Sequence, residues 1–315
     1  MPQTRSAKAI LSHQERTATE PREKDLHAAT VDTITEVNNR IKTFRFALKD
    51  KNGFNFHPGQ WLDVFVPGVE KAGGFTITSS PRDALSQSNR DHAPFFELAV
   101  QKSPNNPPAE WLWGPEEEVQ GQEVNVRVGG SFVWPPPGLD LSKIKRAIFI
   151  AGGVGINPMM SMLAYINQNY PSLQVRLLYS TKVPSRETVP TQVLYLTQLL
   201  DLFRIPRSET TKDRLELYFT GTWDGSLMNR HNTEPIQPLM SLTLPNLDVD
   251  TEVPVVAWTH RIDEIALSSA VGTKEEAKST CFYVCGPPDM TDEIVKYLKE
   301  QEHVVPERVL CEKWW

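Results

Sequence analysis

A glycine-rich turn at residues 152–158 offers the clearest chemistry in the chain. It reads Gly-Gly-Val-Gly-Ile-Asn-Pro and follows directly on the apolar run KRAIFIA. Glycines at this density permit positive φ angles and let a ligand approach the main chain closely. The residues after the turn have a helical pattern, and a helix N-terminus offers free N–H groups and a partial positive charge to a phosphate. A tight strand-to-helix turn without any ligand is the alternative interpretation.

A second turn of the same kind occupies residues 285–290, which read Cys-Gly-Pro-Pro-Asp-Met. It also ends an apolar run and precedes a helical pattern. Turns of this type lie at the carboxyl edge of a parallel sheet, where ligands bind, so the two turns are expected to flank one ligand. Cys285 would then point its thiol toward that ligand, and the alternative is a buried cysteine with a structural role only.

Two halves with different hydrophobic patterns meet at about residue 138. Between residues 30 and 138, short segments such as TFRFAL, QWLDVFV and EVNVRV alternate apolar and polar residues, which predicts an antiparallel β-barrel. Between residues 139 and 315, strand patterns alternate with helical patterns. This alternation is typical of a parallel sheet covered by helices. The predicted fold class is β + α/β, an antiparallel barrel followed by a Rossmann-like nucleotide-binding domain.

Two segments lack a clear pattern. Residues 1–29 are polar and unpatterned, which predicts a disordered lead-in before the barrel. Residues 223–258 contain four prolines without periodicity, which predicts a long surface loop in the second domain. A lid or a docking site for a partner is the alternative for this loop.

Composition excludes several classes of function. The chain has 315 residues and a net charge of −6, which argues against a nucleic-acid partner. No apolar run is long enough to span a membrane. The three cysteines form no C-x-x-C pair, so we expect no metal site, no iron–sulfur cluster and no disulfide framework. These features predict a reducing intracellular compartment, cytoplasmic or mitochondrial.

The two turns, in this order and after a barrel-like half, resemble the NAD(P)H-binding half of the ferredoxin–NADP reductase superfamily. The resemblance covers roughly residues 30–315. It implies a flavin-binding barrel, a pyridine-nucleotide domain, and an Arg261 that follows the fourth strand of that domain and helps to hold the nucleotide. The nucleotide contacts that it implies are Gly152, Gly153, Val154, Gly155, Ile156, Asn157, Pro158, Cys285, Gly286, Pro287, Met290 and Arg261.

The flavin motif of this superfamily, Arg-x-aromatic-Ser/Thr, is altered here. The matching residues are Gly73, Gly74, Phe75 and Thr76, so the aromatic ring and the hydroxyl are present but the arginine is absent. The loss of a charge-assisted contact to phosphate predicts weak binding of FAD, and an arginine at position 73 is expected to improve retention. The flavin contacts that the resemblance implies are Gly73, Gly74, Phe75, Thr76, Thr78, Ser79, Trp314 and Trp315.

One of the two terminal tryptophans would stack on the flavin, and the alternative is a hydrophobic anchor. The resemblance gives catalytic roles to Cys285 and Thr76. It predicts an oxidoreductase that transfers hydride from NAD(P)H to a bound flavin and on to an unidentified acceptor. A nucleotide-binding or sensing protein that has lost flavin chemistry is the alternative. NADH is favoured, because no arginine cluster follows residues 180–182, although Lys182 and Arg186 leave NADPH open.

Overall fold

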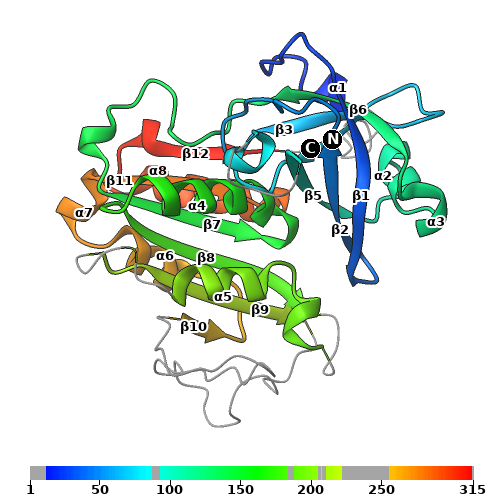
Figure 1. Ribbon diagram of the computed structural model, residues 1–315. Helices are drawn as coiled ribbons and strands as arrows, with labels where there is room; N and C mark the ends of the chain where they lie inside the picture. Colours follow the sequence, from blue (N-terminus) through cyan, green and yellow to red (C-terminus); the bar gives the residue numbers. More distant parts are fainter. Residues whose placement is uncertain are drawn as a thin grey trace, which may run out of the picture. The chain divides into compact units, whose positions relative to one another are not determined.

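The computed structural model describes residues 12–86, 93–183, 188–204, 207, 211–221 and 255–313. The chain divides into two compact units (Figure 1). The first unit is built on residues up to Pro137 and also takes in Asn157–Tyr165, and the second takes in Gly138–Ile156 and the residues from Ile166 to Lys313. No helix in the described part of the chain is long and apolar enough to cross a bilayer.

The first unit is an antiparallel sheet with the strand order β4-β3-β6-β1-β2-β5. An isolated bridge between Ile77 and Leu98 brings β4 near β5, so the sheet is barrel-like without being closed. Apolar side chains on alternate positions of the strands form its core, as the period-two pattern predicts. Its elements are α1 (His13–Arg16), β1 (His27–Asn38), β2 (Ile41–Leu48), β3 (Trp61–Phe65), β4 (Gly73–Thr76), β5 (Phe95–Gln101), α2 (Pro107–Leu112), α3 (Glu116–Val119) and β6 (Glu123–Gly129).

The prediction of a disordered lead-in is wrong for residues 12–29. Ser12 caps α1 through a capping box with Glu15, and the backbone of Arg22 forms an isolated antiparallel β-bridge with Gly129 of β6. Strand β1 already begins at His27. The segment is polar, but it contacts the sheet through charged and aromatic side chains rather than through an apolar stripe, so hydrophobic patterning does not reveal it.

Four side chains hold this segment to the sheet, and we call them the Asp63 cluster: His13, Arg22, Asp63 and Arg127. The Asp63 carboxylate is fully buried. Its Oδ2 accepts hydrogen bonds from Arg22 Nε at 2.9 Å and from Arg127 Nη2 at 2.7 Å. His13 Nε2 lies 3.4 Å from Asp63 Oδ1, and the His13 ring stands edge-on to Trp61 with centroids 4.6 Å apart. A buried carboxylate thus depends on partners from the lead segment and from β6.

His13 is expected to make the stability of the protein depend on pH. The pKa of His13 is lowered from 6.5 to about 4, chiefly by burial; Asp63 opposes this shift, and the nearby Arg22 and Arg16 contribute to it. The folded chain therefore binds this proton more weakly than the unfolded chain does. The contribution is fully present above pH 6.5 and is lost as the pH falls toward 4. Denaturant unfolding should show this loss in the wild type.

The variant His13→Gln should remove that part of the pH dependence, while the control His57→Gln, at an exposed histidine, should retain it. An equal fall in the free energy of unfolding between pH 6.5 and 4 in all three proteins would show that His13 is not a buried neutral group.

The second unit is a parallel sheet with the strand order β10-β9-β8-β7-β11-β12. Helices α6 and α8 pack against one face through a shared apolar core. The Rossmann-like fold predicted for this half is confirmed. Its elements are β7 (Arg146–Gly152), the last residues of α4 (Asn157–Asn169) from Ile166 onward, β8 (Gln174–Val183), α5 (Leu196–Arg204), β9 (Arg214–Gly221), β10 (Val255–Trp258), α6 (Glu264–Val271), α7 (Lys274–Lys278), β11 (Thr280–Cys285), α8 (Pro288–Glu300) and β12 (Val309–Glu312).

The predicted surface loop at residues 223–258 needs one correction. Its last four residues, Val255–Trp258, form β10, which pairs in parallel with β9. Four residues are too few for a period to appear in the sequence, so the strand is evident only from its pairing partner. The remainder of the predicted loop lies outside the described residues.

Candidate functional site

The glycine turn leads from β7 into α4. Gly152 ends the strand, a short 3-10 turn spans Gly153–Ile156, and α4 begins at Asn157 with Pro158 in its first turn. Gly153 has a φ of +55°, which is the left-handed region that favours glycine. A Cβ atom placed on Gly153 would meet no heavy atom within 4 Å. The main chain at this position is therefore open to a ligand.

The other two glycines serve to pack the two turns against each other. A Cβ atom on Gly155 would lie 2.2 Å from the Cys285 carbonyl oxygen. A Cβ atom on Gly152 would lie 2.6 Å from Met290 Sδ and 2.7 Å from Pro287 Cδ. Neither position has room for a side chain, so the turn after β7 and the turn after β11 form one interlocked surface.

A pocket of about 560 Å³ lies beside this surface. Its walls come from the glycine turn, the ends of β8 and β9, the residues after β10 and the first turns of α8. In the sheet, β7 has β8 on one side and β11 on the other, so the strand order reverses at β7. Ligands of doubly wound folds bind at such a reversal, and the volume is within the range of small-molecule sites.

The structure gathers most of the predicted nucleotide residues around the pocket. Gly152, Gly153, Pro287, Met290 and Arg261 line it. Val154, Gly155 and Ile156 belong to the turn itself, and Gly286 lies against Gly152.

Cys285 differs from these residues. Its side chain is only 1% exposed, and it is not among the residues that line the pocket. Its carbonyl group lies against Gly155. A structural role is therefore evident for Cys285, and a catalytic role for its thiol stays a prediction.

The sequence did not single out several polar residues of the pocket. Thr220 comes from the end of β9, and Asp289 and Glu293 come from α8. The parallel pairing of β7, β8 and β9 brings these strand ends to one edge. The order of strands in a sheet was the missing information, because strand patterns do not state which strands are neighbours.

Neighbouring side chains of the first unit occupy the space around the predicted flavin residues of β4. Phe75 is buried and belongs to the core of the sheet. A Cβ atom on Gly73 would lie 2.6 Å from Phe75 Cε2 and 2.8 Å from Pro108 Cβ. An arginine at position 73 would therefore require Phe75 or Pro108 to shift, and the expectation that it improves FAD retention stays a prediction.

The neighbouring residues of this segment are also engaged. Thr78 Oγ1 donates to the Glu97 carbonyl oxygen at 3.0 Å, and the Glu97 N–H donates to Ser79 Oγ at 3.0 Å. A Cβ atom on Gly74 would lie 2.1 Å from the His13 ring, and Thr76 is buried. Residues 73–79 contain no lysine or arginine. This segment therefore offers no side-chain cation of its own to the phosphate-bearing part of a flavin. The terminal residues Trp314 and Trp315 lie outside the described residues.

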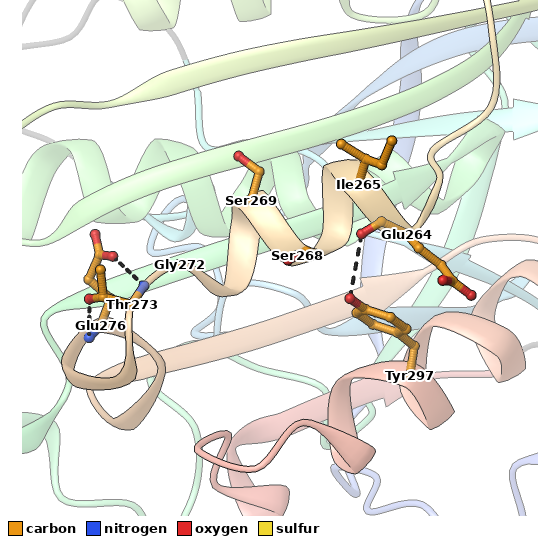
Figure 2. A pocket seen from close by; sticks show the side chains of 8 residues that line it. All are labelled: Glu264, Ile265, Ser268, Ser269, Gly272, Thr273, Glu276 and Tyr297. Carbon is orange, nitrogen blue, oxygen red and sulfur yellow. Dashed lines mark hydrogen bonds between the residues drawn. The ribbon is translucent and has the colours of Figure 1, made fainter.

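A second pocket, of about 680 Å³, lies at α6, α7 and α8 (Figure 2). The Thr273 N–H donates to Glu276 Oε2 at 2.7 Å, and Tyr297 Oη donates to the Glu264 carbonyl oxygen at 3.5 Å. Ser269 Oγ accepts from Arg176 at 3.0 Å. These groups cap or join helices, so the smaller pocket beside the glycine turn is the better candidate for chemistry.

Comparison with known proteins settles the family. No family model matches the chain. The human oxidoreductase NAD-binding domain-containing protein 1 is 33% identical to it over an alignment of 319 positions, which covers 98% of this chain and 86% of the human protein. The chain belongs to the family of this oxidoreductase.

Solved structures agree on the fold. A cytochrome P450 reductase from Amycolatopsis has a TM-score of 0.66 at 17% identity and covers 94% of this chain and 71% of its own. A ferredoxin–NADP reductase from Neisseria gonorrhoeae, solved with bound FAD and NADP, has a TM-score of 0.59 at 16% identity and covers 93% and 100%. The prediction of an oxidoreductase with the ferredoxin–NADP reductase fold is thereby confirmed.

Proposed function

We propose that this oxidoreductase binds NAD(P)H in the pocket beside Gly153 and passes its electrons through FAD to an acceptor. The observation that carries the proposal is the open main chain at Gly153. This residue belongs to the turn after β7, which packs against the turn after β11 at the reversal of strand order. A pyrophosphate needs free N–H groups and a close approach, and this turn offers both. The family and the neighbours in fold support the same pair of cofactors.

Each cofactor would supply chemistry that side chains lack. When bound, NAD(P)H would supply a hydride, and FAD would supply a group able to take up two electrons and release them singly. The chain itself would hold the pyrophosphate at the start of α4 and keep the turns rigid through the contact of Gly155 with Cys285. Rigid contacts of this kind orient a cofactor and add to the rate through positioning.

A nucleotide-binding protein without flavin chemistry is the second candidate. Two observations favour it. Phe75 is buried in the core of the first unit, and Pro108 lies against Gly73, so both occupy space next to the residues that the resemblance assigns to the flavin. The two candidates share the nucleotide pocket and differ only in whether the first unit takes up FAD.

A titration with FAD distinguishes the two candidates. We expect the purified full-length chain to hold FAD weakly, since the charge-assisted contact of an arginine contributes about 1.5–3 kcal/mol and is missing here. FAD should be lost on gel filtration and taken up again when it is added in excess, with a change in flavin fluorescence. A chain that takes up no FAD at saturating concentration, while it still binds NAD(P)H, would favour the second candidate.

A further inference from the structure

Two cations line the nucleotide pocket. Lys182 lies near the end of β8, and Arg261 follows β10. Both side chains are exposed, and within the described part of the chain neither forms an ion pair within 4.0 Å. The stem of Lys182 crosses Gly221, whose absent Cβ would lie 3.0 Å from Lys182 Cγ. The absence of a side chain at Gly221 leaves room for the aliphatic part of Lys182 at the ends of β8 and β9.

Hydroxyl groups line the pocket near Lys182. Ser180, Thr181 and Thr220 line the pocket beside Lys182. The residues at the end of β8, Ser180–Val183, include no aspartate or glutamate. Sites that prefer NAD commonly place a carboxylate near this point of the fold, where it accepts from the ribose 2′-hydroxyl. A cation with hydroxyl donors suits a 2′-phosphate instead.

The pocket also contains two acids, and they belong to its other side. Asp289 and Glu293 lie on α8, which follows β11. Strands β11 and β8 flank β7 on opposite sides, so they are about 10 Å apart across the sheet. The acids are therefore associated with the β11 side of the glycine turn, whereas Lys182 stands on the β8 side.

We infer that the pocket selects NADPH over NADH, with Lys182 and Arg261 as the residues that recognise the 2′-phosphate. The inference rests on the proposed nucleotide site and adds the identity of its ligand. It reverses the expectation of NADH from the sequence, which was based on the lack of an arginine cluster after β8. Arg261 lines the same pocket and comes from a different part of the chain, after β10.

Calorimetric titration of the full-length chain tests the inference. NADPH is expected to bind at least about tenfold more tightly than NADH. Adenosine 2′,5′-bisphosphate should bind more tightly than ADP by a similar factor, which reports on the phosphate subsite without any redox step. Raising the salt concentration should reduce the preference, because both cations are exposed.

Three variants assign the preference to these residues. Lys182→Ala and Arg261→Ala should each weaken NADPH by about tenfold and NADH by much less. Lys182→Glu should invert the preference, since a carboxylate repels the 2′-phosphate and can accept from a 2′-hydroxyl. Lys274→Ala, at a cation of α7 outside the pocket, is the matched control and should keep the wild-type ratio. A melting curve of each variant separates a loss of fold from a loss of recognition.

Two outcomes would overturn the inference in different ways. Equal or tighter binding of NADH by the wild type, or an unchanged ratio in both alanine variants, would refute the 2′-phosphate subsite and leave the nucleotide site standing. No binding of either nucleotide or of the bisphosphate would refute the proposed function together with it.

Discussion

Replacing Gly153 with asparagine is expected to weaken binding of NAD(P)H by about a hundredfold or more while the fold survives. The pyrophosphate would lose its approach to the N–H groups of the turn, and two charge-assisted hydrogen bonds of about 1.5 kcal/mol each correspond to this factor. Asparagine tolerates the left-handed φ of +55°, and the open space around Gly153 accepts its side chain in the absence of ligand. Isothermal titration calorimetry measures the loss, and circular dichroism measures the fold.

Gly138 provides a matched control for this variant. It belongs to the second unit, has a φ of +74°, and an added Cβ would also meet nothing within 4 Å. Gly138→Asn therefore introduces the same side chain at a similar backbone conformation away from the pocket. Equal nucleotide affinity in wild type, Gly153→Asn and Gly138→Asn would place the nucleotide somewhere other than this turn.

Replacing Asp63 with asparagine is expected to lower the free energy of unfolding by about 3–5 kcal/mol, the usual effect of breaking a buried ion pair on one side. The substitution leaves the partly buried Arg22 and Arg127 facing a neutral amide. It also removes the charge that lies next to His13. Denaturant unfolding measures the loss, and limited proteolysis should show that residues 12–25 become accessible.

The exposed Asp25 of the same segment provides the control. Asp25→Asn changes the net charge in the same way, and its free energy of unfolding should stay within about 0.5 kcal/mol of the wild type. If Asp63→Asn were as stable as this control, the lead segment would not be held by the Asp63 cluster.

The sequence predicted the main elements of the second unit because their signals are local. The run that becomes β7, the glycine turn and the helical pattern of α4 are contiguous, so periodicity and turn chemistry suffice. Helix α6 was missed because its sequence EIALSSAV is apolar on most sides and has no clear stripe. Strand β10 is too short for a period, and its place depends on pairing with β9.

Local sequence patterns also cannot show how residues distant in the chain pack together at the predicted nucleotide and flavin sites. The motif identified three glycines as one feature, but only packing distinguishes Gly153, which is open, from Gly152 and Gly155, which contact the second turn. The absence of an arginine at position 73 was visible in the sequence. The occupation of that place by Pro108 depends on how α2 packs against β4, which no local pattern states. The Asp63 cluster joins residues 41 and 64 positions apart, and it was missed for the same reason.

The most direct test of the central claim is the oxidation of NADPH by the full-length chain supplemented with FAD, under anaerobic conditions with ferricyanide as the acceptor. NADPH should be consumed as ferricyanide is reduced, omission of FAD should abolish the reaction, and Gly153→Asn should abolish it while Gly138→Asn does not. A chain that binds both NADPH and FAD and yet leaves NADPH unoxidised would contradict the assignment as an electron-transfer reductase.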